Sequence, residues 1–316
     1  MSDSATVSSS SGTDARAHVA LLLVQFFFST LPIAAKYYVL PHVAPSGLVL
    51  LRVTGGAAIL LLIVRMRNGG RVRDWRDIAR LALYGLLGVS INQLLFIEGL
   101  SRTTAINAQV IGTTIPAFTL GIGALMGIDR ITPVRAIGIL LAASGAIFLI
   151  GPDRIQFTPE TTIGNSMIAV NCLSYSLYLV LSKPILKRYD SLTVIAWVFA
   201  FGTLFVLPFG GTSLARTGAL ATMPSSAWLG VAFIILVPTV GSYVLNAWAL
   251  KRSAPSVVAT YVYLQPLLTG LLAVLIHGES IDSRAIPSAA LIFAGVALST
   301  RTAPVVEPSE LEITRP

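Results

Sequence analysis

Residues 102–132 read RTTAINAQVIGTTIPAFTLGIGALMGIDRIT, and residues 251–281 read KRSAPSVVATYVYLQPLLTGLLAVLIHGESI. Shifted by 150 residues, each stretch has a short basic loop, then an apolar run with a central proline, then an acidic residue. The matched pairs are Leu100 and Leu250, Arg102 and Arg252, Pro116 and Pro266, Thr119 and Thr269, Asp129 and Glu279, Ile131 and Ile281, and Gly145 and Gly295. The sequence therefore predicts an internal duplication.

The composition excludes several classes of protein. The chain has 316 residues, of which 54% are hydrophobic and 11% are charged, and its mean hydropathy is +0.79. Soluble proteins carry about 25% charged residues, so we expect an integral membrane protein. The formal charge of +8 then reflects membrane topology and not binding to nucleic acid. The single cysteine, Cys172, excludes a disulfide framework, and the three histidines match no metal-ligand spacing, so no cofactor or metal is expected.

Long apolar runs predict the number of membrane spans. A helix that crosses a bilayer needs about 20 apolar residues, and its backbone must form its own hydrogen bonds. Ten candidates follow: Ala17–Leu40, Pro45–Val64, Ile78–Leu100, Ala105–Gly127, Pro133–Ile150, Ile163–Lys183, Leu192–Phe209, Ala227–Leu250, Pro255–His277 and Ala285–Thr300. We therefore predict an all-α integral membrane bundle with an irregular connection near residues 210–226. Residues 1–16 and 302–316 are predicted to be disordered tails.

Each half of the chain holds five predicted spans. Because five is odd, the second copy must enter the membrane upside down, which divides the chain into repeats at residues 17–150 and 151–301. Lysine and arginine concentrate on the side of the N-terminus, whereas the other side holds Arg102, Arg154, Arg216 and Arg284. The positive-inside rule then predicts that both termini are cytoplasmic. The abundance of arginine, alanine and glycine favours a bacterial inner membrane.

The two quoted stretches resemble the EamA-domain branch of the drug/metabolite transporter (DMT) superfamily, and the resemblance covers about residues 17–300. Each stretch has the small-residue helix with a central proline and a closing acidic turn. The first departs from the family pattern, because it has Asp129 where glutamate is usual. The resemblance implies ten helices in two inverted five-helix repeats around a central cavity. It also implies transport of small molecules, often export of amino acids or other metabolites.

Three charged residues fall in the outer halves of the predicted spans, namely Lys36, Arg52 and Glu98. Charge inside a bilayer is costly, and all three lie in the outer half of their spans. One hypothesis is a polar cluster that faces the cavity and holds an anionic group of the cargo. The alternative is that the side chains snorkel to the interface or form structural ion pairs. Glu98 is the only acidic residue within a span, and it is shallow, so proton coupling has weak support and facilitated diffusion or exchange stays open.

Neutral polar residues at helical spacing predict which side chains line the cavity, because lipid would penalise them. The candidates are Gln25, Ser29, Asn92, Gln93, Gln109, Thr113, Asn171, Tyr175, Tyr178, Tyr243, Asn246, Tyr261 and Gln265. Hydrogen bonding between helices is the competing use. Pro116 and Pro266 are candidate hinges, because a proline inside a helix removes a hydrogen bond and kinks it; packing is the alternative.

The leading functional hypothesis is a secondary transporter that works by alternating access, as inverted repeats favour. The alternatives are a non-transporting membrane sensor or assembly protein and, less favoured, an integral membrane enzyme. No phosphate-binding loop is present, so direct use of ATP is not expected. The expected partners are a small-molecule substrate and the lipid bilayer. Small-residue seams such as Gly138 with Ala142, and Gly121 with its neighbours, predict close helix packing within the chain or, alternatively, a homodimer face.

Overall fold

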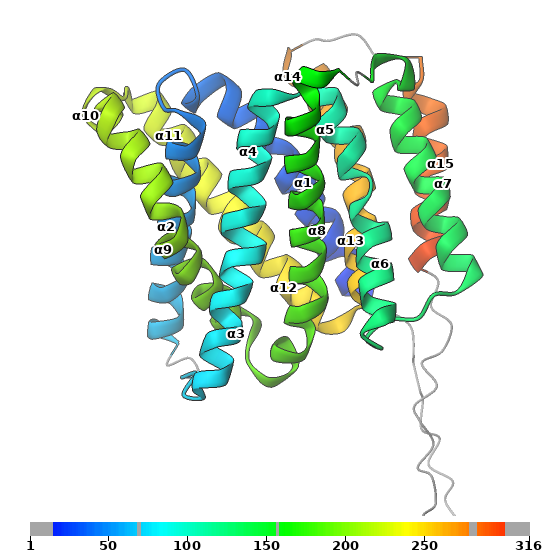
Figure 1. Ribbon diagram of the computed structural model, residues 1–316, viewed down its shortest axis with the longest axis horizontal. Coiled ribbons are helices and arrows are strands. Elements are labelled where there is room, and N and C mark those ends of the chain that lie inside the picture. Colours follow the sequence, from blue (N-terminus) through cyan, green and yellow to red (C-terminus); the bar gives the residue numbers. More distant parts are fainter. Residues whose placement is uncertain (1–14, 68–70, 156–157, 278–282, 301–316) are drawn as a thin grey trace, which may run out of the picture.

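The computed structural model describes residues 15–67, 71–155, 158–277 and 283–300. Every regular element in these ranges is helical, and the long helices lie side by side in one bundle (Figure 1). The first-half elements are α1 (Ala15–Ala34), η1 (Ala35–Val39), α2 (Pro45–Met66), α3 (Trp75–Gly85), η2 (Leu86–Ile91), α4 (Asn92–Arg102), α5 (Ala105–Gly112), α6 (Ile115–Leu125) and α7 (Pro133–Ile150). The others are η3 (Pro152–Arg154), α8 (Pro159–Arg188), α9 (Ser191–Thr217), α10 (Ala219–Thr222), α11 (Ser225–Ile234), η4 (Ile235–Gly241), α12 (Ser242–Arg252), α13 (Pro255–Thr260), η5 (Tyr261–Leu264), α14 (Gln265–His277) and α15 (Ala285–Thr300).

The prediction of an all-helical membrane protein is confirmed for the described residues. Nine helical stretches there are long and apolar enough to cross a membrane. The tenth predicted span is the apolar helix α15, whose 16 residues reach only about 24 Å at 1.5 Å per residue. Residues 15 and 16, which we predicted to lie in the N-terminal tail, already belong to α1. The rest of the two predicted tails, Glu279 and Ile281 lie outside the described residues.

Local chemistry explains where many of these helices begin. Four long helices or helical stretches begin with a proline, which is suited to the first turn because it needs no hydrogen-bond donor there: Pro45, Pro133, Pro159 and Pro255. Side-chain oxygens cap other first turns; Thr132 accepts the backbone N–H of Arg135, and Asp190 accepts that of Leu192. The predicted helix starts at positions 45, 133 and 255 agree with the structure for this reason.

Several spans depart from regular α-helix near their middle. The third span passes through the π-helix η2, and the eighth passes through the π-helix η4. The fourth span breaks between Gly112 and Ile115, and the ninth tightens to the 3₁₀-helix η5. Such irregular turns free backbone groups from the α-helical pattern and often occur at functional sites.

Helix pairs from the two halves of the chain pack against each other. The closest pairs are α7 with α15 and α2 with α9, and α4 lies along α8 as α1 lies along α12. A Cβ atom added to Gly138 would lie 2.4 Å from the backbone nitrogen of Ser299, and one added to Gly295 would lie 2.4 Å from that of Ala142. The predicted seam at Gly138 is therefore an intramolecular contact with α15. Gly121, by contrast, has open space beside it.

The irregular connection predicted near residues 210–226 is wrong. Helix α9 continues to Thr217, and α10 and α11 follow after short turns. Gly210 does not break α9, because it is a packing position: a Cβ atom there would lie 2.4 Å from the Cβ atom of Leu50 in α2. Gly210, which we expected to lie in a loop, instead allows α9 and α2 to approach closely.

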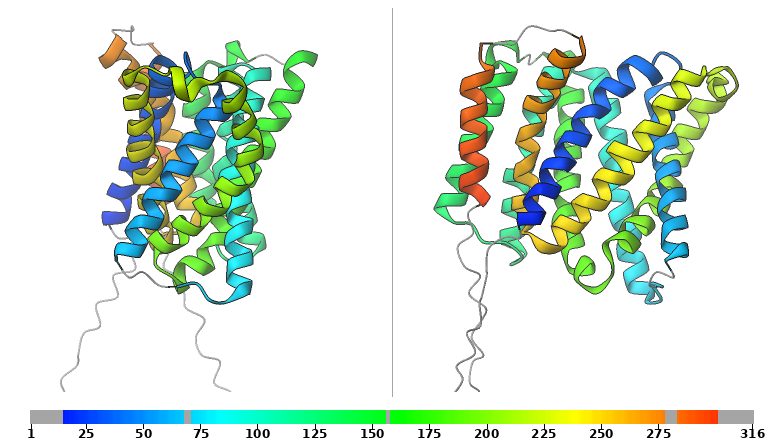
Figure 2. Two further views of the ribbon diagram at one scale, coloured as in Figure 1. Left: turned by 90° about the vertical axis from the view of Figure 1, so that its left-hand side faces the viewer. Right: turned by 180° about the vertical axis from the view of Figure 1, so that it is seen from behind.

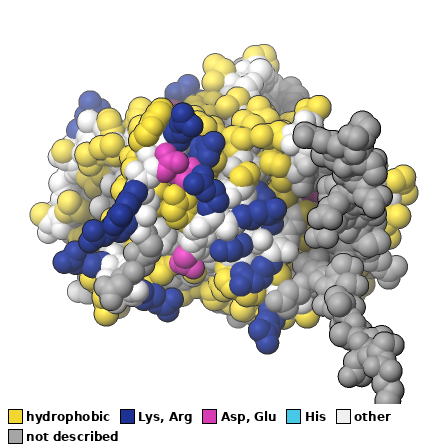
Figure 3. Space-filling view, turned by 90° about the horizontal axis from the view of Figure 1, so that it is seen from below, with side chains coloured by type: hydrophobic (Ala, Val, Ile, Leu, Met, Phe, Trp, Pro, Cys, Tyr) yellow, Lys and Arg dark blue, Asp and Glu magenta, His cyan; other side chains and the backbone are white. Residues whose placement is uncertain are grey.

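Charge is distributed unevenly between the two ends of the bundle. The start of α1 and the end of α15 lie at the same end (Figure 2). That end carries many lysine and arginine side chains and few acidic ones, as the view from below shows (Figure 3). The end of α2, the start of α3 and the connections α8–α9 and α12–α13 lie at this end (Figure 1).

Candidate functional site

Arg52 is the most deeply placed of the three predicted charged residues. It lies in α2, is only 8% exposed, and donates from Nε to the hydroxyl of Thr239 in η4 at 3.2 Å. Among the described residues, no carboxylate lies within ion-pair distance of its guanidinium, and no hydrogen bond uses its two Nη atoms. The structure therefore holds a buried cation with one hydroxyl partner.

Tyr243 connects this position to α4. It lies one turn after Thr239, and its hydroxyl accepts a hydrogen bond from Nε2 of Gln93 at 3.3 Å. Its ring packs edge-on against Phe199 at a centroid distance of 4.8 Å and against Phe28 at 5.7 Å. Gln93 is 6% exposed, and its Oε1 atom is buried with no hydrogen-bond partner among the described residues. We call Arg52, Thr239, Tyr243 and Gln93 the central polar group.

A second set of predicted residues meets between α1 and the ninth span. Gln265 donates from Nε2 to Oε1 of Gln25 at 2.8 Å. Ser29 donates to the backbone oxygen of Gln25 at 2.7 Å and is close to that of Gln265 at 3.4 Å. The hydroxyl of Tyr261 contacts Nδ1 of His18. Apart from the Ser29–Gln25 bond within α1, these contacts join residues more than 230 positions apart and supply the helix–helix hydrogen bonds that were the competing interpretation.

The stripe predicted on α8 faces two different helices. Asn171 donates to the backbone oxygen of Asn92 in α4. Tyr175 accepts from Nδ2 of Asn246 in α12 at 3.5 Å, and its ring lies beside that of Tyr178, which is 1% exposed. The stripe therefore ties α8 to both α4 and α12.

The structure does not bring the remaining predicted residues to the central polar group. Lys36 is exposed beside the ring of Tyr37, and Glu98 forms an ion pair with Arg102, in which both side chains are about half exposed. Both residues have contacts other than Arg52 in this structure, and the hypothesis of one cluster of Lys36, Arg52 and Glu98 stays a prediction. Gln109 is exposed as well. The predictions counted the depth of each residue along its span, which does not give the direction of its side chain around the helix.

The two prolines lie next to the interruptions of the fourth and ninth spans. Pro116 is in the first turn of α6, just after the break, and Pro266 is in the first turn of α14, just after η5. The interruptions also meet: the hydroxyl of Tyr263 in η5 donates to the freed backbone oxygen of Thr113 at 2.9 Å. The hinge role of the prolines stays a prediction, but their placement beside a broken turn agrees with the expected loss of helical hydrogen bonds.

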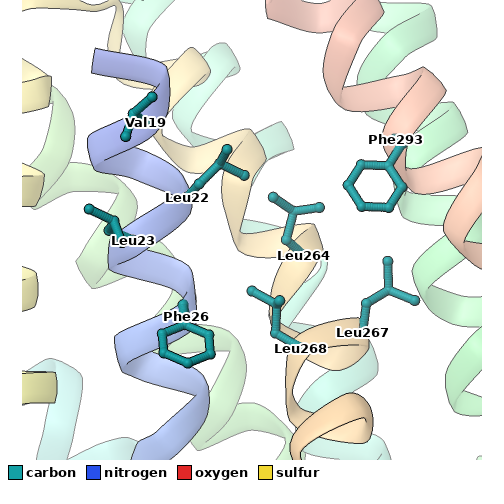
Figure 4. A pocket seen from close by; sticks show the side chains of 8 residues that line it. All are labelled: Val19, Leu22, Leu23, Phe26, Leu264, Leu267, Leu268 and Phe293. Carbon is teal, nitrogen blue, oxygen red and sulfur yellow. The ribbon is translucent and has the colours of Figure 1, made fainter. Parts of the chain in front are cut away.

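The bundle also has apolar hollows on its outside. One, of about 400 Å³, lies between α1, α14 and α15 and is lined by Val19, Leu22, Leu23, Phe26, Leu264, Leu267, Leu268 and Phe293 (Figure 4). Another of about 400 Å³ lies between η1, α11 and α14. None of the predicted polar residues lines either hollow. Their apolar linings suit lipid chains better than a polar cargo.

Sequence reasoning missed two groups at the basic end, one around the buried Asp129 and one around the half-buried Lys183. Asp129 pairs with Arg135, accepts the backbone N–H of Ser256 at 3.2 Å, and also accepts its hydroxyl. Lys183 in α8 donates to the backbone oxygens of Leu250 and Ser253, which close the end of α12. The acidic residue that closes both repeat stretches was the available signal for the first group.

Asp77 joins three side chains at this end, Arg80, Arg188 and Tyr189, and we call this group the Asp77 clasp. Its carboxylate is fully buried and contacts Arg80 at 3.0 Å and Arg188 at 2.9 Å. It also accepts the hydroxyl of Tyr189 at 2.8 Å, and this hydrogen bond raises the pKa of the Tyr189 phenol because it favours the neutral form. The clasp fixes the α8–α9 connection to the start of α3.

Comparison with known proteins gives the family. A family model described as the EamA-like transporter family matches residues 15–151 and again residues 162–301. The chain belongs to this family. The resemblance to the DMT superfamily is therefore confirmed, and the protein is a multi-pass membrane protein of a transporter family.

Individual relatives agree with this assignment. An uncharacterized transporter of Archaeoglobus fulgidus is 26% identical over 83% of this chain and 89% of its own length. A probable terminal-alkyne amino-acid exporter of Streptantibioticus cattleyicolor is 27% identical over 81% of this chain and 84% of its own. A solved crystal structure with 22% identity matches 90% of this chain and 97% of its own with a TM-score of 0.73, which shows a shared fold.

Proposed function

We propose that this EamA-family protein is a secondary transporter that moves small organic metabolites by alternating access. Amino acids or related compounds are the proposed cargo, and export from the cytoplasm is the proposed direction. A relative named as a probable amino-acid exporter supports the choice of cargo and direction. The protein needs no cofactor in this proposal.

The proposed architecture is ten spans in two inverted repeats, residues 17–150 and 151–301. Two separate matches to one family model support it. So do the helix irregularities, because η2 and η4 fall at corresponding places of the third and eighth spans, as the interruptions do in the fourth and ninth. The reciprocal packing of α1 with α12 and α4 with α8 is what a two-fold relation between the halves would produce.

The observation that carries the proposal is the location of the central polar group. Arg52 and Gln93 come from the first half of the chain, whereas Thr239 and Tyr243 come from the second. Inverted-repeat carriers bind their cargo near the midplane between the repeats, so that rocking of one repeat against the other exposes the site to either side. A buried polar group at that interface suits a cargo site.

The proposed orientation places the basic end of the bundle in the cytoplasm, in a bacterial inner membrane. The basic surface of Figure 3 and the positive-inside rule support it. A reporter fused after Arg315 should then be active in the cytoplasm. Activity of that reporter only outside the cytoplasm would reverse the orientation.

Flux into and out of proteoliposomes tests the function. Vesicles that hold the purified protein and a mixture of the twenty radiolabelled L-amino acids should lose label faster than protein-free vesicles. Arg52→Ala should reduce this flux per folded molecule more than Arg216→Ala, because Arg216 is exposed at the end of α9. No flux above protein-free vesicles would reject the cargo class, and equal flux in both variants would reject a role for Arg52.

A further inference from the structure

The charge balance around Arg52 is incomplete. Removing a guanidinium from water costs several kcal/mol unless a partner restores the lost interactions. Here the residue is 8% exposed, and the protein supplies the hydroxyl of Thr239 to Nε and no carboxylate from the described residues. The two Nη atoms are therefore left for a partner outside the described protein. Their fork matches the two oxygens of a carboxylate.

Gln93 offers a hydrogen-bond acceptor near Arg52 that is unpaired within the described part of the chain. Its Nε2 donates to the Tyr243 hydroxyl, whereas its buried Oε1 has no hydrogen-bond donor among the described residues. A buried acceptor without a donor also costs free energy. Among the residues that the structure describes, Arg52 therefore lacks an anion and Gln93 lacks an N–H donor, and both side chains lie beside Tyr243.

The surroundings of these two groups are aromatic. Phe199 and Phe28 pack edge-on against the Tyr243 ring. Gly56, one turn along α2 from Arg52, leaves its Cβ position 3.2 Å from both the ring of Phe199 and the methyl group of Thr239. The side chains nearest to Arg52 and Gln93 are therefore largely aromatic, which favours a cargo with an apolar side chain.

We propose that the cargo is an α-amino acid with an apolar side chain, whose carboxylate pairs with Arg52 and whose amino group donates to Oε1 of Gln93. This inference rests on the transport function proposed above and assigns the chemistry of its site. Thr239 positions the guanidinium through Nε, and Tyr243 positions the Gln93 amide.

Binding to detergent-purified protein tests the assignment without transport. The probes are L-leucine, L-methionine and L-phenylalanine, the carboxamide of each, which lacks the anion, and 3-phenylpropionate, which lacks the amino group. Affinity is read from the rise of the thermal unfolding midpoint with probe concentration. At least one of the three amino acids should bind the wild type at least tenfold more tightly than its carboxamide.

The variants then assign each contact to a residue. Arg52→Met should weaken amino-acid binding at least tenfold and remove the preference over the carboxamide, whereas Arg216→Met should change neither. Gln93→Leu should weaken binding of the amino acid but not of 3-phenylpropionate. If Arg52→Met does not fold, Arg52→Lys serves instead, because it keeps the charge but loses the fork, and the wild-type comparison needs no variant.

The outcomes separate this assignment from the proposed function. Equal binding of acid and carboxamide, full affinity in Arg52→Met, or no binding of any amino acid would overturn the assignment. Equal weakening of phenylalanine and 3-phenylpropionate by Gln93→Leu would overturn the Gln93 contact. If the binding assignment fails but the protein moves neutral or cationic compounds across the membrane, the transporter function is retained. If the protein binds the carboxylate at this site but moves no compound, the transporter function is overturned and the binding site is retained.

Discussion

Arg52 and Arg135 are buried to the same degree, at 8% exposure each, but the protein treats their charges differently. Arg135 lies at the basic end and pairs with Asp129, whose carboxylate also binds the start of α13 through Ser256. Arg52 lies within the bundle, where the described residues supply only the hydroxyl of Thr239 as a hydrogen-bond partner. Because the two side chains are equally buried, they differ in whether a carboxylate compensates the buried charge. The end of the bundle is closed by an internal ion pair, and the centre leaves a cation for which we propose an external partner.

The largest expected effect is on the compensated pair. Asp129→Asn leaves the Arg135 charge buried without its partner, and breaking a buried pair in this way costs about 3–5 kcal/mol. We expect the free energy of unfolding in detergent to fall by that amount. An unchanged unfolding midpoint would show that Asp129 does not stabilise the buried charge of Arg135. The two buried arginines would then not differ in how their charges are compensated.

The second prediction has the opposite sign. Arg52→Met removes a charge that has no carboxylate partner among the described residues, so the free energy of unfolding should stay constant or rise by up to about 3 kcal/mol, the insertion cost of a central arginine. Arg135→Met is the matched variant, and it should destabilise the fold because Asp129 is then unpaired. Equal destabilisation by both variants would mean that Arg52 is a structural residue.

A smaller effect is expected at Ser256. Ser256→Ala removes the hydroxyl that donates to Asp129 but keeps the backbone N–H bond, and a hydrogen bond to a charged group contributes about 1.5–3 kcal/mol. The unfolding midpoint should fall less than in Asp129→Asn. Ser166→Ala, at an exposed position of α8, is the control and should have no measurable effect. A larger loss in the control would indicate a general effect of substitutions in these helices.

The smallest effect is expected at Glu98. Its ion pair with Arg102 is about half exposed on both sides, and exposed pairs contribute about 0–1 kcal/mol. Glu98→Gln should therefore change neither the unfolding midpoint by a measurable amount nor the flux per folded molecule. Loss of flux in this variant would support a functional role for the predicted cluster of Lys36, Arg52 and Glu98.

Some of the site followed from sequence, but its contacts did not. Helical spacing and the penalty for polar groups in lipid selected Gln25, Gln93, Tyr243 and Gln265, and the structure buries or half-buries all four. The same argument selected Lys36 and Gln109, which are exposed. Depth along a span can be counted from its end, whereas direction around the helix depends on which neighbours pack against it.

Thr239 shows why the decisive partner could not be found in advance. It is a single threonine in an apolar run beside Pro238, and one such residue gives no pattern. It meets Arg52 only because η4 packs against α2. That contact depends on small residues, such as Gly56, that permit close approach.

The sequence by itself determined a helical membrane protein with a duplicated pattern, because apolarity, proline starts and basic connections act over one helix at a time. Only the tertiary structure decided that Arg135 has a carboxylate partner, whereas the described residues give Arg52 none. Compensation of a buried charge depends on atoms from distant parts of the chain, and these meet only once the helices have packed.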